Sequence, residues 1–211
     1  MISVVVADDQ AAVREGLTTI LSLTDGIEVV GAAADGTEAE QMVQAHRPDV
    51  LLLDLHMPIR GGLDVLPELV VRFPSTKVLV LTTYSDETSI SEALAAGAHG
   101  YITKSDGAAQ IIAAITAVAA GHGAFGREVT TQLVGALTNR ARLDRVARHY
   151  GLTEQETRVL KLIGTGLRNR EIAAELFVSV ATIKTHINNM FTKLGVQSRQ
   201  QALELVAEKS R

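Results

Sequence analysis

The chain of 211 residues contains no cysteine, so it has no disulfide framework, no thiolate zinc cluster and no cysteine nucleophile. Such a composition fits a reducing compartment. No basic residue precedes Arg14, which is unlike a secretory signal. No apolar run approaches the roughly 20 residues that a membrane-crossing helix needs. We therefore expect a cytoplasmic protein that makes no contact with a membrane.

Charge is divided unevenly along the chain, which is 46% hydrophobic and long enough for two domains of ordinary size. Residues 1–120 carry 16 acidic and 6 basic side chains, a net charge of −10, whereas residues 121–211 carry 8 acidic and 14 basic ones, a net charge of +6. The basic part is where a polyanion such as nucleic acid would bind. The alternative is that these cations form an ordinary solvated surface.

Five short apolar runs rich in β-branched residues occur in the first half, at positions 2–7, 27–33, 50–53, 77–81 and 100–103. Runs such as 51–53 and 78–80 do not alternate with polar residues, which is typical of parallel strands covered by helices on both faces. Segments with helical spacing lie between the runs, and Ser85 and Ser105 are placed to cap two of them. The pattern predicts a doubly wound (βα)5 α/β domain.

Polar residues follow four of the predicted strands: Asp8 and Asp9, Asp54, Thr82 and Thr83, and Lys104. Ligands of a doubly wound sheet bind beyond the carboxyl ends of its strands. Three carboxylates in one crevice repel one another unless a cation lies among them, and an oxygen-only ligand set suits Mg²⁺. Each residue alone has a structural alternative, because Asp commonly ends strands and caps helices. The joint pattern favours a metal site.

Four segments of this half together resemble the receiver domain of two-component response regulators: Asp8-Asp9, residues 51–58 (LLLDLHMP), Leu81-Thr82 and residues 97–104 (GAHGYITK). The resemblance implies that Asp54 accepts a phosphoryl group from a sensor histidine kinase. It also implies that Mg²⁺ is bound by the carboxylates of Asp8, Asp9 and Asp54 and by the backbone carbonyl of His56.

The resemblance assigns roles to three further residues. Lys104 would supply a fixed cation to a phosphoryl oxygen, and Thr82 a hydroxyl that moves toward the attached phosphoryl group. Tyr101 would follow Thr82 inward as a switch. The sequence departs from the family pattern at Ser105, where many receivers have proline, and at residues 59–62 (IRGG), where Met-Asp-Gly is common after the proline.

Two other functions remain open for this half. A phosphohydrolase of the haloacid dehalogenase type also uses an aspartyl phosphate, but it needs a second Asp two positions after the nucleophile, where this chain has His56. The side chain of His56 itself can be interpreted as a metal ligand or a phosphorelay histidine, although its backbone matters more at this position. A receiver that works without phosphorylation is the second alternative, against which the retained acid cluster and lysine argue.

Residues 121–150 are interpreted as a turn with Gly121, Gly123 and Gly126, followed by a linker helix that carries Arg140, Arg142, Arg145 and Arg148. Nucleic-acid binding and a solvated face are both open for these arginines. From Leu152 on, the sequence predicts four short helices. Thr153 and Glu156 form a capping-box pattern, and Asn169 and Ser179 are placed to cap later helices. Gly164 and Gly166 end the first of these helices, and Gly195 ends the third.

The middle pair of these helices, at 170–177 and 180–194, has the spacing of a helix-turn-helix. On the second helix the apolar residues Ile183, Ile187, Met190 and Leu194 share one face. The opposite face presents small and polar side chains that suit a major groove: Ala181, Lys184, Thr185, Asn188 and Thr192. An amphipathic helix on an ordinary surface would show the same two faces.

Four segments here resemble the LuxR-type DNA-binding domain: residues 152–163 (LTEQETRVLKLI), 166–173 (GLRNREIA), 182–186 (TIKTH) and 193–196 (KLGV). With the receiver pattern before them, they identify the chain as a member of the NarL/FixJ response regulators. The resemblance implies base contacts from Lys184, Thr185 and Asn188. It implies phosphate contacts from Ser179, Thr182, His186 and Lys193. Members of the family often have Lys at the position of Asn188. An amide can read adenine through two hydrogen bonds, whereas lysine favours the acceptors of guanine, so the DNA sequence that this chain prefers is open.

We therefore predict a receiver domain over residues 1–120, a linker with a helix over 121–150, and an all-α four-helix helix-turn-helix domain over 151–211. The family implies a transcription regulator rather than an enzyme, with Mg²⁺ as cofactor. Its implied partners are a sensor histidine kinase, double-stranded DNA, a second copy on DNA and RNA polymerase. A last helix at 199–209, with Ala202, Leu203 and Val206 on one stripe, either pairs two copies or packs in the bundle.

Overall fold

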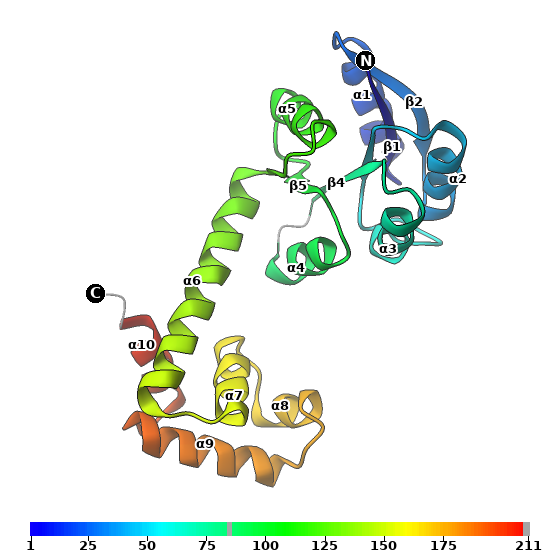
Figure 1. Ribbon diagram of the computed structural model, residues 1–211. Helices are drawn as coiled ribbons and strands as arrows, with labels where there is room; N and C mark the ends of the chain where they lie inside the picture. Colours follow the sequence, from blue (N-terminus) through cyan, green and yellow to red (C-terminus); the bar gives the residue numbers. More distant parts are fainter. Residues whose placement is uncertain (84–85, 209–211) are drawn as a thin grey trace. The chain divides into compact units, whose positions relative to one another are not determined.

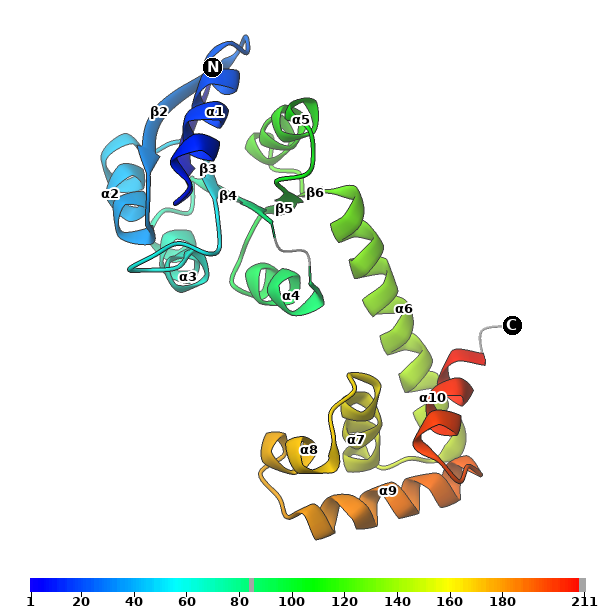
Figure 2. The same ribbon diagram turned by 180° about the vertical axis from the view of Figure 1, so that it is seen from behind.

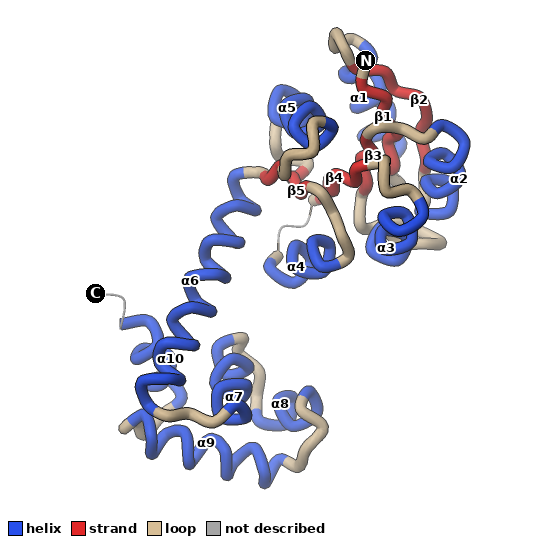
Figure 3. Tube along the Cα trace, viewed as in Figure 1, coloured by secondary structure: helices blue, strands red, loops and turns tan. Residues whose placement is uncertain are grey.

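The computed structural model describes residues 1–83 and 86–208. The chain divides into two compact units, Met1–Leu133 and the part from Val134 onward. The first unit contains strands and helices and the second contains helices, as the colours of Figure 3 show. The predicted fold classes are confirmed. The predicted boundaries at residues 120 and 150 stay predictions.

A parallel sheet with the strand order β2-β1-β3-β4-β5-β6 forms the centre of the first unit. Its strands are β1 (Ile2–Ala7), β2 (Ile27–Ala33), β3 (Val50–Leu53), β4 (Lys77–Thr82), β5 (Gly100–Thr103) and β6 (Ala124–Phe125). The chain moves from β1 to one edge and then returns past β1 to β3. The topological switch point therefore lies between β1 and β3, where ligands of such sheets bind.

Helices cover both faces of the sheet (Figures 1 and 2). One face packs against α2 (Gly36–His46), α3 (Gly62–Arg72) and α4 (Glu87–Ala95), and the other against α1 (Ala11–Ser22) and α5 (Ala108–Ala119). Buried strand residues such as Val5 and Leu51 point into the first layer, and Val4 and Leu52 into the second. Every strand between two helix layers is therefore apolar on both faces, which explains the lack of alternation.

Local details differ from the sequence predictions at three places. The strand β6 was not predicted, because two residues are too few to show a period. Ser105 does not cap α5, whose N-cap is Gly107; its hydroxyl instead lies 2.7 Å from Thr103 Oγ1. Asn169 is the first residue of its helix and not the cap, which is Arg168. The predicted cap Ser85 lies outside the described residues.

The helix α6 (Arg127–Tyr150) begins in the first unit, where Val129 is fully buried in the layer that contains Tyr101. Four helices follow it: α7 (Glu154–Gly164), α8 (Asn169–Glu175), α9 (Val180–Leu194) and α10 (Arg199–Glu208). Their core contains Leu160, Ile163, Ile183 and Met190, together with Val146 from the end of α6. The second unit is thus a small helical bundle with its own core.

Candidate functional site

The acidic cluster lies at the carboxyl ends of β1 and β3. Ala7 and Leu53 are paired across these strands, and the Asp54 N–H donates to the Ala7 carbonyl at 2.9 Å. Parallel pairing therefore places Asp8 and Asp54 side by side, with Asp9 next to them. Carboxylate oxygens of all three residues lie within 4.8 Å of one another. Asp8 and Asp54 are 1% and 4% exposed, whereas Asp9 is exposed to solvent.

Lys104 brings a cation to this cluster from the loop after β5. Its ammonium nitrogen lies 2.7 Å from Asp8 Oδ2 and 2.6 Å from Asp54 Oδ2. Burial favours the neutral amine, but the hydrogen bonds and charges of Asp54 and Asp8 outweigh it and raise the pKa of Lys104 above its ordinary value. One lysine therefore compensates two buried carboxylates.

The donor set fits a hard divalent cation, because three carboxylates converge and two of them are buried. The His56 N–H donates to Asp54 Oδ1 at 3.3 Å, so the backbone after Asp54 turns toward the acidic cluster. The side chain of His56 is exposed and does not belong to the group of converging ligand atoms. A role of the His56 carbonyl as a metal ligand stays a prediction.

Thr82 and Tyr101 are both fully buried, at the end of β4 and within β5. The Lys104 N–H donates to the Thr82 carbonyl at 2.8 Å, so the end of β4 is hydrogen-bonded to the loop that follows β5. Burial and the negative charges of Asp86 and Asp54 raise the pKa of the Tyr101 phenol, which is therefore protonated at neutral pH. In this structure the Tyr101 ring points into the core.

The loop after Asp54 is held by contacts that the sequence analysis missed. Arg60 pairs with Glu40 of α2 and with Glu68 of α3, at 2.7 Å in each case. Gly62 follows, where a Cβ would lie 2.1 Å from the Asp54 carbonyl oxygen, so only glycine fits. The sequence shows that residues 59–62 depart from the family pattern, but it does not show the partners of Arg60, because Glu40 and Glu68 belong to other segments of the chain.

The two faces of α9 are those predicted. Ile183, Met190 and Leu194 are buried in the bundle and Ile187 is partly buried, whereas Lys184, Thr185 and Asn188 are exposed. Ser179 caps the helix, because its hydroxyl accepts from the Thr182 N–H at 3.0 Å. The Ser179 and Thr182 hydroxyl oxygens are also 2.8 Å apart. The exposed polar face of α9 therefore starts at a capped helix end.

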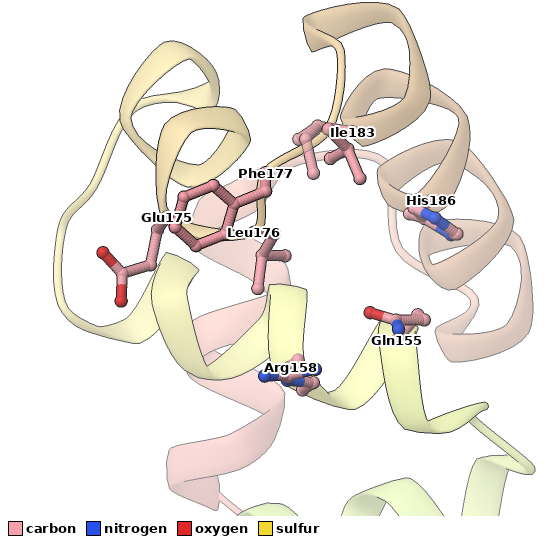
Figure 4. Close-up of a pocket in the computed structure, with 8 residues that line it drawn as sticks. Gln155, Arg158, Glu175, Leu176, Phe177, Ile183 and His186 are labelled. Carbon is pink, nitrogen blue, oxygen red and sulfur yellow. The ribbon is translucent and has the colours of Figure 1, made fainter.

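His186 lies beside a pocket of about 350 Å³ between α7, the end of α8 and α9 (Figure 4). Gln155 and Arg158 line the same pocket from α7. Arg158 is exposed and makes no ion pair with any other residue in the described ranges 1–83 and 86–208. Nothing in the sequence singles out Arg158, because its spacing does not relate it to His186.

Lys193 is exposed at the end of α9 and pairs with the buried carboxylate of Glu156. Its ammonium nitrogen lies 2.7 Å from Glu156 Oε2 and 3.1 Å from the Gly151 carbonyl oxygen. The predicted phosphate contact of Lys193 stays a prediction, with these partners competing for the ammonium.

On α10, Ala202 and Val206 pack in the bundle core, while Leu203 is 36% exposed. The predicted stripe of α10 is thus partly used for bundle packing.

The family described as "Response regulator receiver domain" matches residues 4–116, and the family "Bacterial regulatory proteins, luxR family" matches residues 151–206. The chain belongs to the response regulators of the NarL/FixJ family. This response regulator is 40% identical over 211 residues to "Oxygen regulatory protein NreC" of Staphylococcus epidermidis, with 98% of this chain and 97% of that protein covered. It is 36% identical to "Transcriptional regulatory protein LnrK" of Bacillus subtilis, with 96% and 94% covered.

Solved structures of response regulators are similar over the whole chain. The response regulator ChrA of a heme-sensing two-component system is 32% identical, with a TM-score of 0.54 and 99% and 97% of the two chains covered. RcsB in a complex with DNA is 25% identical, with a TM-score of 0.63 and 98% of both chains covered. The response regulator is accordingly a phosphorylation-dependent transcription regulator of a two-component system.

No helix of this response regulator within residues 1–83 and 86–208 combines the length and the apolar composition that membrane crossing requires.

Proposed function

We propose that Asp54 is the phosphoacceptor of this response regulator and that phosphorylation controls how its second unit binds paired DNA sites. The single observation that supports this proposal most is the pair of contacts from the Lys104 ammonium to Asp8 and Asp54, at 2.7 and 2.6 Å. A fixed cation at the end of a buried strand is what a carboxylate needs in order to hold a dianionic group.

In the proposed reaction, an Asp54 oxygen attacks the phosphorus of a phosphohistidine on a sensor kinase. A phosphorus–oxygen bond forms, the phosphorus–nitrogen bond breaks, and the imidazole leaves with the bonding electron pair. Asp8, Asp9 and Asp54, with the His56 carbonyl, would hold Mg²⁺, which offsets the charge of the incoming group. Lys104 binds one phosphoryl oxygen and thereby exchanges one anionic partner for another.

The proposed switch consists of Thr82 and Tyr101. The Thr82 hydroxyl donates to the attached phosphoryl group, which draws the end of β4 toward Asp54. Tyr101 lies in the neighbouring strand, where Thr82 pairs with Thr103 and Val80 with Tyr101. A movement of β4 is therefore transmitted to the core layer that contains both Tyr101 and Val129 of α6.

In the second unit, Lys184, Thr185 and Asn188 of α9 contact base edges in the major groove, and Ser179, Thr182 and His186 contact phosphates. The excess of basic side chains after residue 120 supports this assignment. RcsB, a similar response regulator, forms a complex with DNA. We also propose that a second copy of the chain binds the DNA and that the two copies contact each other through α10. RNA polymerase is the proposed partner of this dimer.

A cytoplasmic location goes with these partners. The receiver catalyses only the gain and the slow loss of its own phosphoryl group. A receiver that works without phosphorylation is the alternative. The pairing of Lys104 with two buried carboxylates argues against it, because a buried ion pair stabilises a fold little compared with apolar residues of similar size, so stability alone does not account for the group.

The proposal is tested by DNA footprinting with the full chain on duplexes that it selects from a random-sequence pool. Wild type and Asp54→Asn are compared with and without acetyl phosphate and Mg²⁺. We expect the phosphodonor to strengthen or extend the footprint of the wild type and to leave that of the variant unchanged. An equal response of both proteins would overturn the role of Asp54, and no selected DNA would overturn the role of the second unit.

A further inference from the structure

The buried carboxylate of Glu156 links the recognition helix α9 to the start of α7. Glu156 is 3% exposed, although it carries a charge. Its Oε2 accepts a hydrogen bond from the Thr153 N–H at 2.7 Å and another from the Lys193 ammonium at 2.7 Å. One oxygen atom thus joins the N-cap of α7 to the last turn of α9.

The capping box fixes the position of this carboxylate. The Thr153 hydroxyl accepts from the Glu156 N–H at 3.3 Å, while the Glu156 side chain returns to the Thr153 N–H. The carboxylate therefore has little rotational freedom. A cation that pairs with it is held in a defined place relative to α7.

Lys193 makes a second contact that points the same way. Its ammonium donates to the Gly151 carbonyl at 3.1 Å, in the turn between α6 and α7. The opposite end of α9 is held by its own cap at Ser179. Contacts of Lys193 thus secure the end of α9 that the cap does not reach, and Asn188 lies between these two ends.

We propose that Lys193 is a positioning residue for DNA recognition: by pairing with Glu156 it sets the orientation of α9, and it does not act by neutralising a DNA phosphate. The inference rests on the proposed function of α9 as the helix that reads DNA. Movement of the ammonium to a phosphate would leave a buried carboxylate without its cation, which is strongly unfavourable. A lysine without a buried carboxylate partner could contact a phosphate without this cost.

The two roles of Lys193 predict opposite effects of Glu156→Gln. The amide oxygen of glutamine can still accept from the Thr153 N–H, so the capping box keeps an acceptor, but the charge that binds Lys193 is gone. If Lys193 positions α9, Glu156→Gln and Lys193→Gln both weaken binding, each about tenfold, which corresponds to about 1.4 kcal/mol. If Lys193 contacts a phosphate, Glu156→Gln frees the ammonium and binding stays equal or becomes tighter.

The test uses the full chain, treated with acetyl phosphate and Mg²⁺, and a duplex that the wild type selects from a random-sequence pool. Affinities are measured over a series of salt concentrations for wild type, Lys193→Gln, Glu156→Gln and the double variant. Lys161→Gln is the matched control, because it removes a lysine charge from α7 whose partner Asp144 is 3.8 Å away and has a side chain that is 47% exposed. Circular dichroism and the thermal midpoint establish that each variant is folded at the temperature used.

A positioning role predicts four results. The losses of the single variants do not add in the double variant, because both remove the same pair. The slope of log affinity against log salt stays that of the wild type. Discrimination between the selected duplex and its single-base variants decreases, which a loss of stability alone does not cause. Lys161→Gln preserves affinity and discrimination.

A phosphate contact predicts other results: Lys193→Gln lowers the salt slope by about one unit, discrimination is unchanged, and Glu156→Gln does not weaken binding. That outcome overturns the inference and leaves the proposed function intact. If wild type itself selects no duplex, the proposed function fails first. If Lys193→Gln does not fold, Glu156→Gln alone distinguishes the two roles. A positioning role predicts that this variant binds more weakly, whereas a phosphate contact predicts equal or tighter binding.

Discussion

The ammonium nitrogen of Lys104 lies 2.6 Å from Asp54 Oδ2, although 50 residues separate the two in the chain. The same ammonium lies 2.7 Å from Asp8 Oδ2. The lysine therefore compensates the buried carboxylates before any phosphoryl group arrives. In the proposed reaction, phosphorylation of Asp54 would replace one carboxylate partner of Lys104 by a phosphoryl oxygen.

Asp54 is expected to be the sole phosphoacceptor. Wild type and Asp54→Asn are incubated with acetyl phosphate and Mg²⁺, and the intact mass is measured. The wild type should gain one phosphoryl group and the variant none, because an amide is not a nucleophile for phosphorus. Adducts of equal yield on both proteins would contradict the assignment.

Lys104→Met should lower the free energy of unfolding by about 3–5 kcal/mol in the absence of Mg²⁺, since it leaves two buried carboxylates without their cation. Added Mg²⁺ should restore more stability to the variant than it adds to wild type, because the ion then compensates the same charges. Denaturant titrations with and without Mg²⁺ measure both effects. Lys77→Met is the control, as that ammonium contacts only the Pro74 carbonyl, at 3.4 Å, among the described partners. An equal gain from Mg²⁺ in all proteins would place the ion elsewhere.

Gly62→Ala should destabilise the first unit by about 1–3 kcal/mol, because the new methyl group would lie 2.1 Å from the Asp54 carbonyl oxygen, which is backbone and has to move. Gly16→Ala on α1 is the matched control, since no atom lies within 4 Å of its Cβ position. Removal of a glycine from a helix should there raise stability by about 0.5–1 kcal/mol. Chemical denaturation compares the two, and a destabilisation of similar size at both positions would refute the steric argument.

Asn188→Ala should cost about 1–3 kcal/mol on a selected duplex and relax the preference at one base pair, because a bidentate amide contact is lost. Asn189→Ala, at the next residue of α9, is the control, since Asn189 is exposed but has no predicted base contact, and this variant should keep the preference. Affinities are measured on the selected duplex, on its single-base variants and on random DNA. An equal loss on all of them would mean that another stripe of α9 reads the bases.

The second unit should lose stability in acid through Glu156. Burial opposes ionisation, but the hydrogen bonds from Lys193 and Thr153 and the charge of Lys193 outweigh it, and the pKa of Glu156 falls below its ordinary value of 4.5. The ionised carboxylate therefore stabilises the fold above about pH 4.5, and this contribution is lost as the pH falls through the lowered pKa of the folded state. Glu156→Gln should flatten this part of the pH profile of the thermal midpoint; a profile as steep as that of wild type would rule Glu156 out.

The sequence by itself determined the features that depend on neighbouring residues. Apolar runs placed five strands, and polar residues after them located the acid cluster, because parallel strands end at one edge of a sheet. The period of 3.6 residues assigned Ile183 and Asn188 to opposite faces of α9, which their burial confirms. Both kinds of inference need only the geometry of a single strand or helix.

Only the tertiary structure decided the contacts between residues far apart in the chain. The sequence contained Glu156 as a capping residue and Lys193 as a basic residue of a helix, but their pairing depends on how α7 packs against α9. Arg60 pairs with Glu40 and Glu68, which lie on two different helices, so these ion pairs also depend on how the helices pack. Long charged side chains have many exposed positions open to them, and only the packing of the apolar core brings a particular acid within reach of a particular base.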